Sequence, residues 1–370
     1  MIKKGVEKVA VVKCKSYSQK QVDKAIRKIL KLLDFDEKEK SKYKKILIKP
    51  NVVGAYKDNL AIVTHPSIVR SIIKQFKGEI FVGESSFMDT EKAFKGSGYS
   101  GFANLVVFEK SNLIKIKDKN AKVLRDFYFP KIIKQADLVV NVPKLKTHSL
   151  TMLSGAIKNL YGCIPGGMKQ VLHKKAIGDK KFSSLLVDIY RNVNPGLNIM
   201  DCVVAMEGNG PTSGKLKKVG LIMASRNAVA LDIAAAKIMG FKPRRILFVK
   251  EAIKRKLYPS YEIEVIGDVK EIPNLRFEKP ASWMKESVKI FLGKLIKGNK
   301  IVVDKEKCVK CATCAKKCPG KAITLNPYPE INRKKCIRCF CCIEICPEHA
   351  MHLKETKFRK FVRKIRDRRK

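Results

Sequence analysis

The sequence is poor in acidic residues. Its 370 residues include 34 aspartates and glutamates against 79 lysines and arginines, which gives a formal net charge of +45. A charge of this size favours acidic proteins, anionic membrane, nucleic acid or anionic small molecules as partners. Because the lysines are scattered through every segment, a lysine-rich composition spread over solvated faces is the alternative explanation.

Long apolar runs are also missing. No uncharged apolar segment approaches the roughly 20 residues that a membrane-spanning helix needs. The first 15 residues contain lysines followed by only a short apolar run, which predicts a strand and not a signal peptide. These absences predict a cytoplasmic protein, in which the twelve cysteines stay reduced.

The common signatures of organic cofactors and of histidine-bound metals are absent. No G-x-G-x-x-G motif follows a predicted strand, since the glycines from Gly96 to Gly101 have the wrong spacing and follow a helical pattern. The sequence therefore offers no nicotinamide or flavin fingerprint. Of the five histidines, His65, His148 and His173 could contribute to a metal site, but no H-x3-H spacing supports one.

Eight of the cysteines form two copies of one motif. Each copy reads C-x2-C-x2-C-x3-C-P, the run that holds a [4Fe–4S] cluster in bacterial-type ferredoxins. Three cysteines on a tight loop point at three corners of one cluster, whereas the fourth begins a helix and reaches the other cluster. The motif predicts two [4Fe–4S] clusters, the first held by Cys308, Cys311, Cys314 and Cys346 and the second by Cys336, Cys339, Cys342 and Cys318.

The two copies form an internal repeat with one constant offset, and residues 301–356 resemble a small α+β two-cluster ferredoxin domain. Structural zinc is the main alternative, but zinc sites do not need the third and fourth cysteine of each run. Disulfides belong to oxidising compartments, which nothing else in the sequence indicates. A ninth cysteine of this region, Cys341, is predicted to be a buried residue and not a ligand.

The preceding residues, 1–280, alternate strand and helix patterns. This alternation predicts an α/β domain, in one or two lobes, with a mostly parallel sheet. Apolar strands at 46–48, 80–82, 138–142 and 197–206 each run directly into a polar motif, and a helix is expected from about 152 to 160. Residues 281–300 are predicted to form an amphipathic linker helix and residues 357–370 a basic tail.

The polar motifs lie where ligands bind in open α/β sheets, beyond the carboxyl ends of the strands. Together they resemble the family called "domain of unknown function 362", over about residues 8–270. The motifs that carry the resemblance are Lys49-Pro50-Asn51, Thr64-His65-Pro66, Pro143-Lys144-Leu145-Lys146-Thr147-His148, Lys158-Asn159-Leu160-Tyr161-Gly162, Glu207-Gly208-Asn209-Gly210-Pro211 and Asp232.

Members of this family are often fused to ferredoxin modules, so the resemblance implies a redox context, although it implies no agreed reaction. A fainter similarity, around Thr64-His65-Pro66, is to the N-terminal domain of nickel-pincer lactate racemases.

The strand-end residues are suited to binding an anion. Lysine ammonium groups attract a carboxylate or phosphate, glycines let backbone N–H groups approach it, and His148 is able to transfer a proton near neutral pH. Ordinary turns, a structural histidine and solvated lysines are the alternative explanation. The candidate catalytic residues are Lys49, Lys144, Lys146, His148 and Glu207, and the candidate ligand-binding residues are Gly208, Asn209, Gly210, Lys158 and Asn159.

Two functions are compatible with these features. In the first, the ferredoxin module passes single electrons to or from an anionic ligand in the α/β domain, as an oxidoreductase or oxidoreductase subunit. In the second, the chain is an electron carrier or scaffold whose α/β domain binds a partner or ligand without catalysis.

The expected partners are a redox protein and an anionic small molecule. The basic tail carries nine basic residues and one acidic residue, net +8, and predicts an acidic protein or an anionic membrane surface as a further partner, unless the tail is only a solvated end. Nucleic-acid binding rests on charge alone and lacks aromatic stacking motifs.

Overall fold

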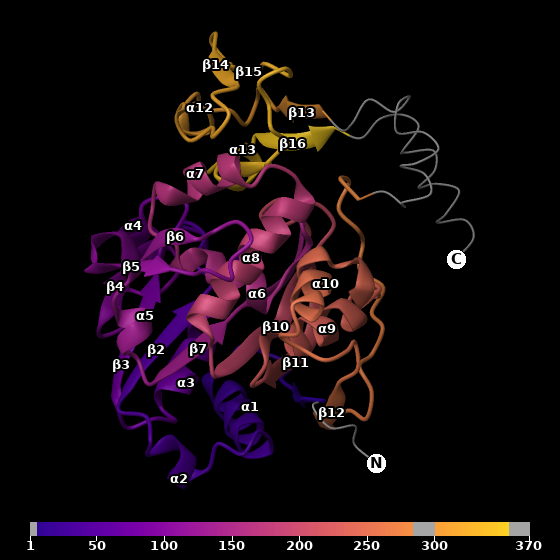
Figure 1. Cartoon of the computed structure of the whole chain (residues 1–370). Helices are drawn as coiled ribbons and strands as arrows, with labels where there is room; N and C mark the ends of the chain where they lie inside the picture. The colour runs from indigo at the N-terminus through magenta and orange to yellow at the C-terminus, as the bar shows by residue number, and fades with distance from the viewer. Residues whose placement is uncertain (1–5, 284–299, 355–370) are drawn as a thin grey trace.

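The fold was analysed on a computed structural model, which describes residues 6–283 and 300–354 (Figure 1). Most of the expected linker helix at 281–300 and the whole basic tail at 357–370 lie outside the described residues. The domain boundaries drawn from the sequence therefore stay a prediction.

A mixed, mostly parallel sheet forms the centre of the α/β domain. Its main path runs β12-β1-β11-β10-β7-β2-β3-β4. The pairs along β10-β7-β2-β3-β4 are parallel, and β11 is antiparallel to both of its neighbours. These strands are β1 (Lys8–Lys13), β2 (Lys45–Pro50), β3 (Glu79–Glu84), β4 (Leu105–Val107), β7 (Leu138–Val142), β10 (Leu197–Glu207), β11 (Lys215–Ser225) and β12 (Glu264–Gly267).

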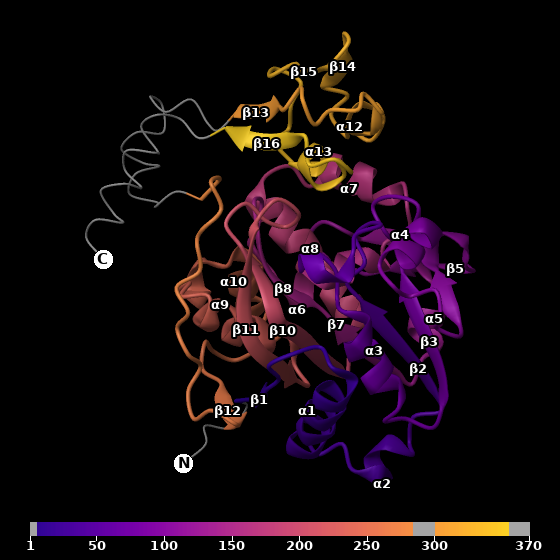
Figure 2. The ribbon, with the colours of Figure 1, turned by 180° about the vertical axis from the view of Figure 1, so that it is seen from behind.

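Helices cover both faces of this sheet, which confirms the predicted α/β class (Figures 1 and 2). Neighbouring strand residues face opposite sides: Leu47 packs with α8 and α9, whereas Ile46 and Ile48 pack with α1 and α3. The main helices are α1 (Gln19–Leu32), α3 (Pro66–Ile73), α4 (Thr90–Gly96), α7 (Met168–Lys175), α8 (Asp179–Val193), α9 (Ala228–Ile238) and α10 (Leu247–Lys254).

Shorter elements complete the domain. A separate hairpin lies beside the main sheet, and single helical turns connect the strands. These elements are α2 (Glu37–Lys40), β5 (Leu113–Lys117), β6 (Asp126–Pro130) and α5 (Ile132–Gln135). None of the helices within residues 6–283 and 300–354 is long and apolar enough to cross a membrane.

The segment after β7 positions the candidate residues of the Pro-Lys-Leu-Lys-Thr-His motif. The chain continues past Pro143 as β8 (Lys144–His148), which lies parallel to β10 in an irregular register and antiparallel to β9 (Met152–Ser154). All five residues of β8 are buried. The motif is therefore a buried strand that follows β7 directly and extends the sheet beside β10.

The helix expected at about 152–160 is wrong in its first half. Residues 152–154 form β9, and the helical part, α6, spans only Ala156–Asn159 before a 3-10 turn. The buried Asp232 carboxylate fixes this start, because it accepts the N–H groups of Ala156 and Ile157 at 2.6 and 2.9 Å. A Cβ atom on Gly155 would lie 2.0 Å from Asp232 Oδ1, so this approach requires glycine.

The ferredoxin module is built from two similar halves. Left-handed backbone positions occur at Lys310, Ala312 and Lys321 and again, 28 residues later, at Arg338, Phe340 and His349. Each half places a single helical turn at the same point of its cysteine run. The elements are β13 (Lys300–Val303), α12 (Thr313–Lys316), β14 (Ile323–Leu325), β15 (Pro329–Ile331), α13 (Cys341–Glu344) and β16 (Met351–Lys354).

The module lies at one end of the molecule, with α13 against the α/β domain near α7 in both views (Figures 1 and 2). Two hydrogen bonds join α13 to that domain: Tyr56 Oη donates to the Glu344 carbonyl at 3.1 Å, and Thr212 Oγ1 donates to the Ile343 carbonyl at 3.4 Å. The rings of Tyr56 and His349 lie 5.6 Å apart at the same contact.

Candidate functional site

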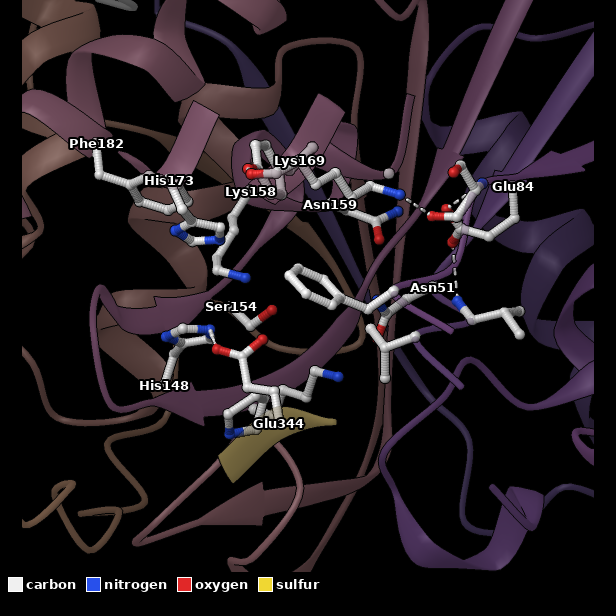
Figure 3. A pocket seen from close by; sticks show the side chains of 18 residues that line it. Asn51, Glu84, His148, Ser154, Lys158, Asn159, Lys169, His173, Phe182 and Glu344 are labelled. Atoms are coloured by element: carbon white, nitrogen blue, oxygen red, sulfur yellow. Dashed lines mark hydrogen bonds and ion pairs between the residues drawn. The ribbon is translucent and has the colours of Figure 1, made fainter. Parts of the chain in front are cut away.

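A small cavity of about 60 Å³ lies between the strand ends of the α/β domain and the ferredoxin module (Figure 3). A water molecule needs about 10–15 Å³ by this measure, so the cavity has room for a few waters or a small anion. Charged, imidazole and amide side chains from six segments line it: Asn51 after β2, Glu84 of β3, Lys146 and His148 of β8, Lys158 and Asn159 of α6, Lys169 and His173 of α7, and Glu344 of α13.

Glu344 brings a carboxylate from the ferredoxin module into this cavity. Its Oε1 atom lies 3.1 Å from His148 Nε2, and Figure 3 shows the side chain pointing toward His148 and the cavity. Burial raises the pKa of Glu344, but His148, Lys158 and His173 outweigh it and bring the pKa to about 2. The cavity thus holds a carboxylate that the α/β domain does not supply.

His148 is held as a neutral imidazole. Its Nδ1 atom accepts the backbone N–H of Leu150 at 3.0 Å and lies 3.4 Å from the N–H of Thr151, so the ring proton sits on Nε2, toward Glu344. Burial lowers the pKa of His148 to about 4, and Lys158 lowers it further while Glu344 opposes the shift. This environment favours the neutral form of His148 at neutral pH.

Two lysines carry their amino groups to the same cavity. Lys146 Nζ donates to the carbonyl of Ile62 at 2.6 Å, and burial, followed by the charge of Lys158, lowers the pKa of Lys146 well below its usual value. Burial also lowers the pKa of Lys158, while Glu344 raises it. Among the described residues, none accepts a hydrogen bond from Lys158 Nζ, which points toward the space between His148 and Glu344 (Figure 3).

At the other end of the cavity a lysine pair surrounds Glu84. Lys49 Nζ lies 2.8 Å from Glu84 Oε2, and the backbone N–H of Val52 donates to the same oxygen at 2.9 Å. Lys169 donates to the carbonyls of Ser85 and Ser86. Burial lowers the pKa of Lys169 to about 8 while Glu84 opposes the shift, so this lysine titrates nearer to neutral pH than His148 does.

The wall at α7 is aromatic. The imidazole of His173 stacks on Phe182, with ring centroids 4.7 Å apart and an interplanar angle of 12°, and meets Tyr161 edge-on. Burial lowers the pKa of His173 to about 4. Two buried side-chain oxygens facing the cavity, Asn51 Oδ1 and Asn159 Oδ1, lack hydrogen-bond partners among the described residues. The cavity therefore offers unused acceptors as well as amino groups.

Lys144 lies apart from this cavity. Its Nζ atom is 2.8 Å from Asp201 Oδ2 and 2.6 Å from the hydroxyl of Tyr17, in a fully buried cluster. The stacked ring of His65 covers Tyr17, at 3.8 Å between centroids. Lys144 is neutralised there, so the expectation that it joins Lys146 and His148 at one site is corrected.

Residues 207–210, the Glu-Gly-Asn-Gly loop, do not line this cavity either, and their polar groups already have partners within the protein. Glu207 pairs with Lys217 at 2.9 Å, and Gly208 and Gly210 donate their N–H groups to the carbonyls of Glu278 and Gly208. Asn209 accepts the N–H of Ala281 at 2.9 Å. Because these groups are already bonded, the loop does not cradle an anion as expected; it packs against β8, where a Cβ on Gly210 would meet the carbonyl of Thr147 at 2.1 Å.

The structure thus brings four of the predicted residues to one cavity, namely Lys146, His148, Lys158 and Asn159, with Lys49 directly behind Glu84. The sequence motifs did not indicate Lys169 or Glu344, and the sequence indicated His173 only as a possible metal-site residue. No spacing marks them, since they reach the cavity only through the packing of α7 and α13. One feature of the sequence does point to Glu344: it is an acidic residue inside a cysteine run of a strongly basic chain.

The cysteines of the module fall into two sets, and one of these sets surrounds a cavity. One cavity of the module is lined by Cys308, Cys311, Cys314 and Cys346, which come from both halves of the repeat. In the other set, burial raises the pKa of Cys342, and its neighbours Cys339, Cys336 and Cys318 raise it further. Backbone N–H groups of Ala322 and Ala350 point at Cys318 and Cys346, at 3.3 and 3.2 Å.

The first of these arrangements fits an iron–sulfur cluster. Among the described residues, no three His, Cys, Asp or Glu side chains converge closely enough to hold one metal ion. Thiols placed around a space, with backbone N–H groups turned toward the sulfurs, are the arrangement that an iron–sulfur cube requires. Cys341 is buried beside the second set, as expected.

The doubled cysteine loop defines the class of the protein: it binds 4Fe–4S clusters and transfers electrons. Residues 300–347 match the family described as "4Fe-4S dicluster domain". Residues 46–237, more than half of the chain, match the family described as "Domain of unknown function (DUF362)". The chain belongs to this second family and carries an iron–sulfur module behind it.

Two known proteins are similar to the chain. The thylakoid-associated protein sll1697 of Synechocystis sp. is 28% identical over 252 residues, which cover 65% of this chain and 77% of that protein. The lactate racemase apoprotein of Thermoanaerobacterium thermosaccharolyticum has 14% sequence identity and a TM-score of 0.31, over 61% of this chain and 55% of its own.

Proposed function

We propose that the chain is a ferredoxin-linked oxidoreductase, or a subunit of one, that acts on a small anionic molecule in the cavity at Lys146, His148 and Lys158. The observation that carries this proposal is the double role of α13. Its residue Cys342 belongs to a cysteine run, and Glu344, two residues on, closes the cavity. A ligand in the cavity therefore lies next to the part of the module that holds iron.

The cation set supports an anionic ligand. Lys146, Lys158 and Lys169 line the cavity, whereas Glu84 and Glu344 are the carboxylates that line it. Because burial has lowered the pKa values of Lys146 and His148, an anion placed beside them raises both values and favours their protonated forms. Binding would then bring protons into the cavity, where His148 can pass one to a ligand that gains an electron.

The clusters supply single electrons, and we assign their ligands in a crossed pattern. The first set is Cys308, Cys311, Cys314 and Cys346, which share one cavity. The second set is Cys336, Cys339, Cys342 and Cys318. One cysteine of each set, Cys342 and Cys346, lies two residues from Glu344, which lines the anion cavity.

An electron carrier or scaffold is the second candidate function. It is favoured by the small volume of the cavity and by Glu344, which already supplies a carboxylate to the cations. In this function Glu344 is a docking residue, and the α/β domain holds the module in place without turning over a substrate. Cytoplasmic location and binding of the tail to an acidic or anionic surface stay predictions, and the thylakoid-associated relative supports tests with membranes.

The experiment that separates the two functions is anaerobic purification followed by mass spectrometry of co-purifying small molecules. Under the enzyme proposal, the wild-type protein retains a small carboxylate or phosphate. Lys158→Met and His148→Gln lower its occupancy at least about tenfold, because a charge-assisted hydrogen bond and a proton donor are lost. Lys174→Met, at an exposed lysine of α7, is the matched control and retains it.

Iron content and the visible spectrum are measured on the same samples. They stay unchanged in all three variants if the variants act on the α/β cavity alone. A wild-type protein free of anions, with a full iron content, would contradict the enzyme proposal and favour the carrier.

A further inference from the structure

The iron–sulfur module has a second hollow, on a side that the anion cavity does not use. This groove has a volume of about 550 Å³, and it runs along β13 and past β15 toward the second cysteine run. Its lining includes the apolar side chains of Ile301, Val303 and Ile331. Two further lining residues, Cys336 and Phe340, belong to the loop that carries the second cysteine set.

The rim of the groove is cationic. Among residues 6–283 and 300–354, four basic residues and no acidic residue line it: Lys300, Lys305, Arg333 and Arg338. All four are exposed, and among the described residues none forms a salt bridge with Lys300, Arg333 or Arg338. Lys305 lies over the ring of Tyr328 at 5.4 Å. The groove is therefore an unneutralised positive surface around an apolar centre.

The whole iron–sulfur module is also positively charged. Between residues 300 and 354 the sequence has twelve lysines and arginines and five aspartates and glutamates. One of the five, Glu344, is turned into the anion cavity. The surface left to solvent around the second cysteine set is thus more basic than the sequence count alone indicates.

The chain's own segments and a second copy are poor occupants of this groove. Residues 284–299 carry four lysines and one glutamate, and the tail from 357 is net +8, so both are repelled by the rim. A second copy of a chain with net charge +45 is repelled as well. An acidic partner would neutralise the four basic residues of the groove. Because Cys336 of the second cysteine set also lines the groove, a partner bound there is placed to exchange electrons with that cluster.

We infer that this groove is the docking surface for an acidic one-electron carrier protein, which exchanges electrons with the cluster of the second cysteine set. One electron leaves the reduced member of the pair and reduces the oxidised member, with no bond made or broken. The inference rests on the iron–sulfur module and not on the anion cavity. Failure of the cavity proposal therefore leaves it intact.

Binding of oxidised flavodoxin, an acidic flavin carrier, tests this inference by calorimetry at low ionic strength. The groove variant Lys300→Glu/Arg333→Glu reverses two rim charges, and we expect its dissociation constant to rise at least about tenfold. The matched control, Lys24→Glu/Lys31→Glu, makes the same change of net charge on exposed positions of α1, at the far end of the molecule (Figure 1). We expect its constant to stay within about twofold of wild type.

Stopped-flow reduction by flavodoxin hydroquinone supplies the second readout. The rate constant should fall in the groove variant, and the difference from the control should vanish at about 0.5 M salt, where charges are screened. Reduction by methyl viologen radical cation, which is small and positive, should not slow. Iron content and far-UV circular dichroism confirm that each variant is folded and loaded.

Three outcomes would overturn the inference. The first is equal weakening of flavodoxin binding in the groove and control variants, which would make net charge alone responsible. The second is unchanged binding in both. The third is loss of binding to phosphatidylserine vesicles or to RNA in the groove variant with normal flavodoxin binding, which would assign the surface to a membrane or a nucleic acid.

Discussion

Buried amino groups are the most unusual residues of this protein. Lys49, Lys144, Lys146 and Lys169 are each at most 3% exposed, a state that lysine adopts only with compensating contacts. Lys49 and Lys144 have a carboxylate within 2.8 Å. Within the part of the chain that the structure describes, Lys146 and Lys169 bond only to carbonyl oxygens. The first pair is therefore neutralised within the fold, and the second pair is available to an added anion.

The shifted pKa of Lys169 makes a prediction about stability. Its pKa is about 8 in the folded protein against a usual value of 10.5, so burying the charged form costs free energy at pH 7. This cost disappears as pH rises through 8 toward 10.5, because the unfolded chain then binds more protons than the folded one. The free energy of unfolding of wild type should rise over this range relative to Lys169→Met, by roughly 3 kcal/mol.

Thermal unfolding under anaerobic conditions, at several pH values from 7 to 10.5, measures this difference. Lys174→Met is the control at an exposed position of the same helix and should run parallel to wild type. A difference between wild type and Lys169→Met that does not change with pH would show that Lys169 keeps an ordinary pKa.

At the scale of elements, the sequence predicted what local patterns determine. Strand alternation and helical periodicity identified most of the sheet, and the cysteine spacing identified the module. The failures lie where distant segments decide the structure: Asp232 of α9 starts α6 at Ala156, four residues later than the pattern indicated. Likewise Glu344 and Lys169 reach the cavity through α13 and α7, whose docking no local pattern encodes.

The crossed cysteines give a prediction for the two cysteine runs. Cys346 ends the second run but lines the cavity of Cys308, Cys311 and Cys314. Cys346→Ala should therefore damage the cluster of the first run and lower the iron content from about eight atoms per chain. Cys341→Ala, a buried cysteine outside both predicted ligand sets, is the matched control and should keep all the iron.

Iron analysis and electron paramagnetic resonance of the reduced, anaerobically prepared protein distinguish the clusters. An intact signal from the first cluster in Cys346→Ala would reject the crossed pattern. About four iron atoms in the wild-type protein would reject two clusters.

At the scale of the whole molecule, the contact between the module and the α/β domain includes buried polar groups. Removing the Glu344 side chain leaves the buried Nε2–H of His148 without its acceptor and Lys158 without a nearby carboxylate, and an unsatisfied buried donor costs about 1–3 kcal/mol. Glu344→Ala should therefore loosen the docking of α13. Faster amide hydrogen exchange in β8 and α6 should report it, while the iron content stays normal.

Glu348→Ala is the control for this change, because Glu348 is an exposed glutamate of the same module. Its exchange pattern should match wild type. Unchanged exchange in Glu344→Ala would mean that the hydrogen bonds from Tyr56 and Thr212 hold the module without the carboxylate.

The single turn of α13 also limits whether the ferredoxin module can be replaced by a module from another protein. Inserting one residue between Cys342 and Glu344 would rotate one of them by about 100° relative to the other, since an α-helix has 3.6 residues per turn. A ferredoxin module taken from another protein could carry the right cysteine spacing and still present the wrong side chain to His148. Grafting a foreign module onto this α/β domain therefore requires transplanting the Cys341–Glu344 turn intact, as one unit with its neighbours.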